Sequence, residues 1–192
     1  MSLTDAQIDR YSRQIIVPRV GGRGQERLLA AQVLLAGDAR DIEAPLAYMV
    51  GAGVGSIVLK LPAGQTAFTE TSGRNPDVSV TVSDESQGRF DLALVIVGSA
   101  AAKKIADEIA NDREVQALVI ARLDAPGKIF VIPDTQSPRS DNGTFSTRAE
   151  AADFIAMLAT TEAFKLIAGY PENSRPSTIY FTGYETRVRV HR

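Results

Sequence analysis

The stretch from residue 33 to residue 61 constrains the fold most, because its pattern predicts a strand, a tight turn, a helix and a second strand. An apolar run over 33–36 ends at Gly37, and a segment of helical length separates it from a second apolar run that ends at Leu61. A helix between two strands in so short a stretch indicates a parallel βαβ unit. The chain is therefore expected to belong to the α/β class, with the turn at Gly37 placed where such folds bind phosphate.

The turn after the first strand departs from the phosphate-binding pattern GxGxxG. That pattern uses its second glycine to let the backbone approach a phosphate and its third to let helix and strand pack closely. Here Gly37 holds the first position, Ala39 the second and Ile42 the third. Asp38 and Asp41 also place negative charge where a helix N-terminus would otherwise attract phosphate. The pattern thus predicts a degenerate cofactor site, of which Gly37 and Ala39 are the remnant.

Several segments carry a family resemblance, and their order and spacing match that family. They are RYSRQII at 10–16, GQERL at 24–28, the strand from 33, AGVG at 52–55, NP at 75–76 and TEAFKLIAGY at 161–170. On these motifs the chain resembles the ThiF/MoeB/HesA family, bacterial relatives of the ubiquitin-activating enzymes. The resemblance implies a Rossmann-like α/β fold, with a mostly parallel sheet, helices on both faces, an N-terminal helical arm and a C-terminal antiparallel hairpin. We expect a single domain over 1–192, with residues 1–31 as the arm.

The remaining patterns predict elements on either side of the βαβ unit. Helices are expected at 5–16, 25–31, 102–111 and 147–169, and strands at 77–83, 92–97, 115–121, 128–132, 177–181 and 187–190. The alternating strand at 77–83 is expected near a sheet edge, and the wholly apolar strand at 92–97 in the centre. The last two strands are expected to form a hairpin that closes the sheet. The helix at 147–169 shows a thick apolar face, which indicates a core or dimer helix: Phe154, Ile155, Leu158, Phe164 and Leu166.

Arg13 is the functional residue that best matches the family pattern. In the family the arm packs against a partner subunit, and the resemblance implies that Arg13 reaches the triphosphate in the neighbour's nucleotide site. Spacing alone allows a simpler interpretation, in which Arg13 is a surface arginine on the exposed side of a helix. Both interpretations stay open from the sequence.

Other nucleotide ligands that the resemblance implies have no counterpart. The second strand ends in Lys60-Leu61, where a nucleotide-binding fold places an acid for the ribose hydroxyls. The loop at 62–73 is too short for the family's arginine-bearing loop and lysine helix, and Arg74 after it resembles a solvated turn residue. Gly98-Ser99 stands where the family has a metal-binding aspartate. We therefore expect no cofactor, with ATP and magnesium bound only if the site has been rebuilt from other residues.

Three acids near the polar loop after residue 133 offer oxygen ligands of the kind that a hard cation prefers. They are Asp124, Asp134 and Asp141, and their spacing supports no ligand set, so solvated loop acids are the favoured interpretation. The lone histidine, His191, lies at the chain end and is not expected to be catalytic.

Composition excludes several classes of function. The net charge of −2 provides no basic field for nucleic acid or an anionic membrane. The 192 residues include no cysteine, which excludes disulfides, thiolate metal sites and a thioester or persulfide on this chain. No signal peptide or membrane-spanning run is apparent, so a cytoplasmic protein is expected.

Three functional hypotheses follow. The first is a catalytically degenerate binding or scaffold subunit, which supplies Arg13 to a partner during activation of a ubiquitin-like or sulfur-carrier protein. The second is a diverged ATP-dependent adenylyltransferase or nucleotide sensor, and its reaction would be adenylation of a small protein's C-terminus. The third is a structural dimer without nucleotide function. Expected partners are a second copy or an active family member, and a small carrier protein.

Overall fold

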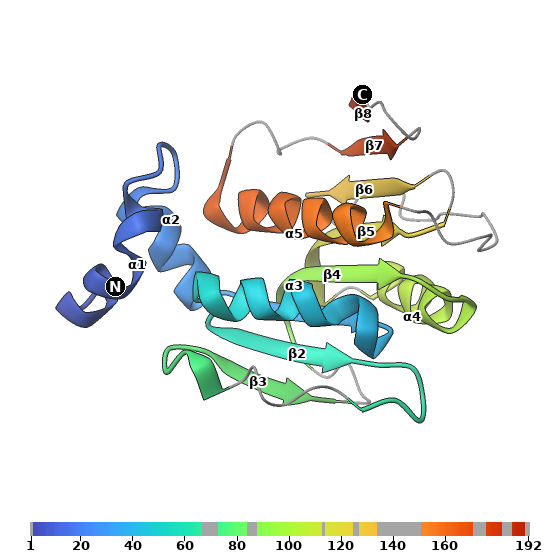
Figure 1. Cartoon of the computed structure of the whole chain (residues 1–192), viewed down its shortest axis with the longest axis horizontal. Coiled ribbons are helices and arrows are strands. Elements are labelled where there is room, and N and C mark those ends of the chain that lie inside the picture. The colour runs from blue at the N-terminus through green and yellow to red at the C-terminus, as the bar shows by residue number, and fades with distance from the viewer. Residues whose placement is uncertain are drawn as a thin grey trace.

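The structure is a computed structural model that describes residues 2–66, 73–83, 88–112, 114–124, 127–133, 151–170, 176–181 and 186–190. Its eight strands form one sheet in the order β3-β2-β1-β4-β5-β6-β7-β8 (Figure 1). The parallel strands are β1 Gln32–Gly37, β2 Ser56–Lys60, β3 Ser79–Val82, β4 Phe90–Val97 and β5 Val115–Arg122. The strands that continue the sheet by antiparallel pairing are β6 Lys128–Ile132, β7 Ser177–Phe181 and β8 Thr186–Val190.

Helices cover both faces of this sheet because side chains of each central strand alternate between two apolar cores. From β1, Val33 and Leu35 face one core with α3 (Ala39–Ala52) and α5 (Ala152–Ala168). Leu34 and Ala36 face the other core, with α4 (Ala100–Ala110). The mostly parallel, Rossmann-like α/β fold with helices on both faces is therefore confirmed.

The arm contains two helices, α1 (Asp5–Ile15) and α2 (Gly21–Ala30). Thr4 caps α1 in a capping box, in which its side chain and that of Gln7 each accept a hydrogen bond from the other's backbone N–H. The predicted start of the second helix at residue 25 was wrong. Helical hydrogen bonding already begins where the Gly24 N–H donates to the Val20 carbonyl, at 2.8 Å.

Both edges of the sheet agree with the predictions from sequence. β3 forms one edge, β4 lies centrally between β1 and β5, and β7 and β8 form the predicted antiparallel hairpin, with β8 at the opposite edge. On the predicted apolar face of α5, Phe154 is 59% exposed in the single chain, which leaves the core and dimer interpretations of this face open for that residue. The residues of α5 that face the sheet repeat every four positions, at Ile155, Ala159 and Ala163.

The described part of the chain includes no helix that is both long enough and apolar enough to cross a membrane. The predicted helical residues 147–150, the acids Asp134 and Asp141, and His191 lie outside the described residues.

Candidate functional site

The crevice between the ends of β1 and β4 is where a sheet of this topology binds a nucleotide, because the strand order reverses there. Gly37 ends β1 with φ of +146°, a conformation that strongly favours glycine. A Cβ added there would lie 2.5 Å from the Ile96 carbonyl oxygen of β4 and 3.0 Å from Cγ2 of Ile42. Gly37 is thus required by backbone packing, whether or not a phosphate binds.

The N-terminus of α3 has a hydrogen-bond partner from within the chain. The Ala39 N–H donates to Oε1 of Gln65 at 2.7 Å, and Nε2 of Gln65 donates to Oδ1 of Asp38 at 2.8 Å. A turn after β2 holds Gln65, whose N–H donates to the Pro62 carbonyl at 3.1 Å. A neutral amide oxygen therefore accepts the hydrogen bond that a phosphate oxygen would accept at a working site. Nothing in the sequence pattern of this loop indicated Gln65.

Ile42, at the third position of the phosphate-binding pattern, lies in the helix–strand contact, as its position in the pattern predicted. Ile42 is 2% exposed and packs in the core that contains β1 and α3. Its branched side chain fills the helix–strand contact that a glycine would leave open.

The ends of β2 and β4 carry side chains that serve the fold. At the end of β2, Nζ of Lys60 lies 3.0 Å from Oε2 of Glu108 on α4. After β4, the Ser99 hydroxyl accepts a hydrogen bond from the Ala102 N–H at 3.1 Å and caps α4. Lys60 and Ser99, which stand where the family resemblance implied a ribose acid and a metal ligand, thus make contacts within the fold.

Asp124 is not the solvated loop acid that was predicted. It is 5% exposed and pairs in a bidentate manner with Arg122 at the end of β5, with Nε to Oδ1 at 2.9 Å. Burial of the carboxylate is offset by this paired guanidinium. Among the described residues, no cluster of three or more histidine, cysteine, aspartate or glutamate side chains could hold a metal ion.

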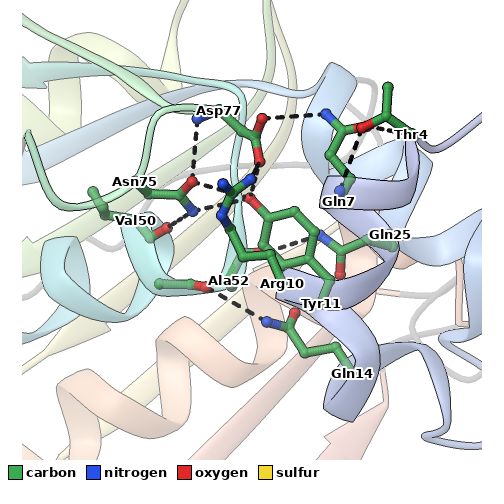
Figure 2. A network of polar contacts seen from close by, with 11 residues as sticks. Thr4, Gln7, Arg10, Tyr11, Gln14, Gln25, Val50, Ala52, Asn75 and Asp77 are labelled. Atoms are coloured by element: carbon green, nitrogen blue, oxygen red, sulfur yellow. Dashed lines mark hydrogen bonds and ion pairs between the residues drawn. The ribbon is translucent and has the colours of Figure 1, made fainter.

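The other end of α3 is where most of the family motifs converge. The last carbonyls of a helix lack the partners that a further turn would supply. In α3 the final three carbonyls each accept a hydrogen bond from a side-chain amide, and the Val50 carbonyl also accepts from the Gly53 N–H at 3.1 Å. The pairs are Asn75 to Val50 at 2.7 Å, Gln14 to Gly51 at 3.5 Å and Gln25 to Ala52 at 3.0 Å. Motif segments that are far apart in sequence therefore act together as the C-terminal cap of α3 (Figure 2).

Tyr11 lies at the centre of this region. Its ring is 1% exposed, and its hydroxyl accepts from Nδ2 of Asn75 at 2.9 Å and donates to Oδ2 of Asp77 at 3.0 Å. Asp77 also forms an ion pair with Arg10 and accepts from Nε2 of Gln7 at 3.3 Å. We call these five residues the arm network, and Figure 2 shows them reaching from α1 to the segment before β3.

The arm network perturbs its acidic groups in opposite directions. Burial alone would raise the pKa of Asp77, but hydrogen bonds from Tyr11, Gln7 and Arg10 and the charge of Arg10 outweigh it, so the pKa lies below its ordinary value of 3.8. Burial raises the pKa of Tyr11 above 10.0, the hydrogen bond with Asn75 opposes this rise, and Asp77 adds to it. Both shifts favour the ionised carboxylate and the neutral phenol that the geometry requires.

Arg13 is exposed, in the last turn of α1. This helix contacts the C-terminal end of α3 through Gln14 and Gly51, whereas Gly37 and Ala39 lie at the N-terminal end. The 14 residues of α3 separate the two ends by about 20 Å at 1.5 Å per residue. The structure therefore brings Gly37 and Ala39 together but keeps Arg13 away from them within one chain.

The chain matches no protein-family model. Among curated proteins it is 32% identical over 122 residues to the SAMP-activating enzyme E1 of Haloferax volcanii, a match over 52% of this chain and 45% of that protein. It is 24% identical over 213 residues to the sulfur carrier protein ThiS adenylyltransferase of Escherichia coli, over 87% of this chain and 84% of that protein. The chain thus spans less than half of the first of these relatives and most of the second.

Solved structures share the fold. A crystal structure of PaaA superposes with a TM-score of 0.65 at 17% identity, over 98% of this chain and 75% of that one. The similarity extends over the arm, the sheet and the C-terminal hairpin, because nearly the whole chain is covered.

Proposed function

Because the chain belongs to the ThiF/MoeB-like family of E1-like proteins, we propose that it acts as a binding or scaffold subunit in the activation of a small sulfur-carrier or ubiquitin-like protein. In this role it contributes Arg13 to the nucleotide site of an active partner subunit. Its own crevice takes no catalytic part.

The observation that carries this proposal is the contrast between the two ends of α3. At the N-terminal end, Gln65 accepts the Ala39 N–H, and Ile42 fills the space beside Gly37. At the C-terminal end the arm is held by several hydrogen bonds, and Arg13 is exposed to solvent. Arg13, which would act on another subunit, is therefore exposed, whereas the positions that would bind a nucleotide within this chain are occupied by its own side chains.

Magnitudes favour a non-catalytic crevice. Adenylation of a carboxylate depends on groups that stabilise charge on the phosphates, and single contacts of this kind are commonly worth about 100- to 1000-fold in rate. The crevice has Lys60 and Ser99 where the ribose acid and the metal ligand would be, and both are engaged in structural contacts. Loss of two such contacts removes about 10⁴-fold or more, which leaves little self-contained activity.

The first experiment is a calorimetric titration of the purified protein with Mg-ATP. The proposal predicts no binding at micromolar concentration. Micromolar binding that is abolished by Ala39→Trp would place the nucleotide in this crevice, and would favour the hypothesis of a diverged adenylyltransferase or nucleotide sensor.

The second experiment tests Arg13 in a mixed assembly with an active family member from the same cell. ATP–pyrophosphate exchange by that partner should rise when this protein is added, and Arg13→Ala should abolish the rise without preventing complex formation. Arginines that act across subunits on transferring phosphoryl groups contribute about 10³-fold or more.

Arg40→Ala is the matched control, since Arg40 is also an exposed arginine but lies at the other end of α3. It should stimulate exchange as well as the wild type does. Equal stimulation by all three proteins would refute a role for Arg13 and leave it as a solvated helix residue. No stimulation by any of them would favour the structural dimer.

A further inference from the structure

The orientation of α1 depends on directional polar contacts more than on apolar packing. Among the described residues of α1, Tyr11 alone is buried, and Ile8 on the same helix is 45% exposed. A helix of 11 residues is also marginally stable on its own. Apolar burial is non-directional, whereas hydrogen bonds restrict distance and angle, so the arm network is what fixes this helix in one orientation.

We propose that Tyr11, Asn75 and Asp77 are positioning residues for Arg13, which hold α1 at the rotation and angle that present its guanidinium to a partner's nucleotide site. This inference rests on the proposed function. It also separates two roles within the segment at 10–14. Arg10, Tyr11 and Gln14 anchor the arm, while Arg13 acts on the partner.

The helical spacing separates anchoring from presentation. Gln7, Arg10, Tyr11 and Gln14 follow the i, i+3, i+4, i+7 pattern of one helix face, and each makes a hydrogen bond or ion pair to α3 or to the segment before β3. Arg13 lies outside that series and is exposed. A rotation of α1 by one residue, about 100°, would turn Arg13 to a different side of the molecule.

The groups that receive α1 are themselves held by rigid structure. Nδ2 of Asn75 donates to the Val50 carbonyl at 2.7 Å, and Oδ1 of Asn75 accepts from the Asp77 N–H at 3.1 Å. Gly53, with φ of +80°, lies so close to Tyr11 that an added Cβ would be 2.5 Å from the phenol oxygen. The receiving surface is therefore formed by the end of α3 and a hydrogen-bonded turn, and it leaves one place for the Tyr11 hydroxyl.

The test measures the arm's orientation directly, and the absence of cysteine from the sequence makes it selective. Asp9→Cys on α1 and Glu43→Cys on α3 place two spin labels at exposed positions, and pulsed electron paramagnetic resonance reports the distribution of distances between them. We expect a narrow distribution in the otherwise unchanged protein. Tyr11→Phe and Asp77→Asn, made separately, should each broaden it at least twofold.

Asp107→Asn is the matched control, since it removes one carboxylate from an exposed ion pair with Lys103 on α4. It should leave the distance distribution unchanged. Circular dichroism establishes which variants are folded, and if one of the two arm variants fails to fold, the other decides. A distribution that stays narrow in a folded arm variant overturns the inference.

The mixed exchange assay then separates this inference from the proposed function. Tyr11→Phe and Asp77→Asn should lower the partner's kcat about 10- to 100-fold while complex formation is retained, because a small misplacement of a catalytic group has effects of that size. Neither should lower it further when Arg13→Ala is already present. If Arg13→Ala has no effect, the proposed function fails; if only the arm variants have none, this inference alone fails.

Discussion

Removal of a single oxygen atom at Tyr11 should destabilise the protein measurably. In Tyr11→Phe the ring stays in its buried site, but the hydroxyl that donates to Asp77 at 3.0 Å and accepts from Asn75 at 2.9 Å is lost. A hydrogen bond to a charged group contributes about 1.5–3 kcal/mol, and one between neutral groups about 0.5–1.5 kcal/mol. Asp77 keeps its contacts with Arg10 and Gln7, and Asn75 keeps Val50, so neither is left without a partner.

We therefore expect the lower part of the summed range, a loss of about 2–3 kcal/mol in the free energy of unfolding. For a domain of this length it corresponds to a decrease of roughly 4–12 °C in Tm. Urea denaturation followed by circular dichroism measures the free energy, and calorimetry measures Tm. The control is Tyr48→Phe, because Tyr48 is 61% exposed and its hydroxyl should be worth less than about 0.5 kcal/mol. Equal stability of the two variants would show that the Tyr11 hydroxyl is not a structural contact.

Three further outcomes are expected. The pKa of Asp77 is lowered in the folded protein from 3.8, so its contribution to the free energy of unfolding is full above pH 3.8 and is lost as the pH falls through the folded pKa. In urea titrations at a series of pH values, Asp77→Asn should therefore show a weaker loss of stability at acid pH than the wild type, and superimposable pH curves would contradict this. Gln65→Ala should cost only about 0.5–1 kcal/mol by thermal denaturation, since water can reach the Ala39 N–H, and a larger loss would show a stronger cap. Light scattering should find a homodimer, because Ile16 and Val17 on the arm are 78% and 43% exposed; a monomer at tens of micromolar would instead mean that this surface binds a different chain.

Most of the fold could be predicted from sequence, because the strands of a buried parallel sheet are continuous apolar runs and the turns between them contain glycine. The segments around β1, β4, β5 and β6 were placed within a few residues of their observed ends. Predictions failed where apolar composition did not decide exposure. Asp124 was placed in solvent and is buried against Arg122, and Phe154, on the apolar face of a predicted core or dimer helix, is exposed in the single chain.

The candidate site was predicted in part. The loss of the phosphate pattern at Ala39 and Ile42 was evident from residue types alone, since a side chain at a glycine position has a steric consequence wherever it lies. The arm network was not evident, although the spacing of Gln7, Arg10, Tyr11 and Gln14 offered a signal. A helix face made of polar and aromatic residues at that spacing can dock by hydrogen bonds as well as an apolar face docks by burial.

The sequence by itself determined which groups are present: a parallel α/β core, an incomplete phosphate turn, no cysteine and an arginine in the arm. These follow from local spacing and from the chemistry of single side chains. Only the tertiary structure decided that Gln65 accepts the hydrogen bond at Ala39, and that Asn75 and Asp77 hold Tyr11 across more than 60 positions in the chain. The reason is physical. Contacts between distant segments depend on how β2, β3 and α3 are placed by the shared sheet, and that placement is set by burial of the whole core.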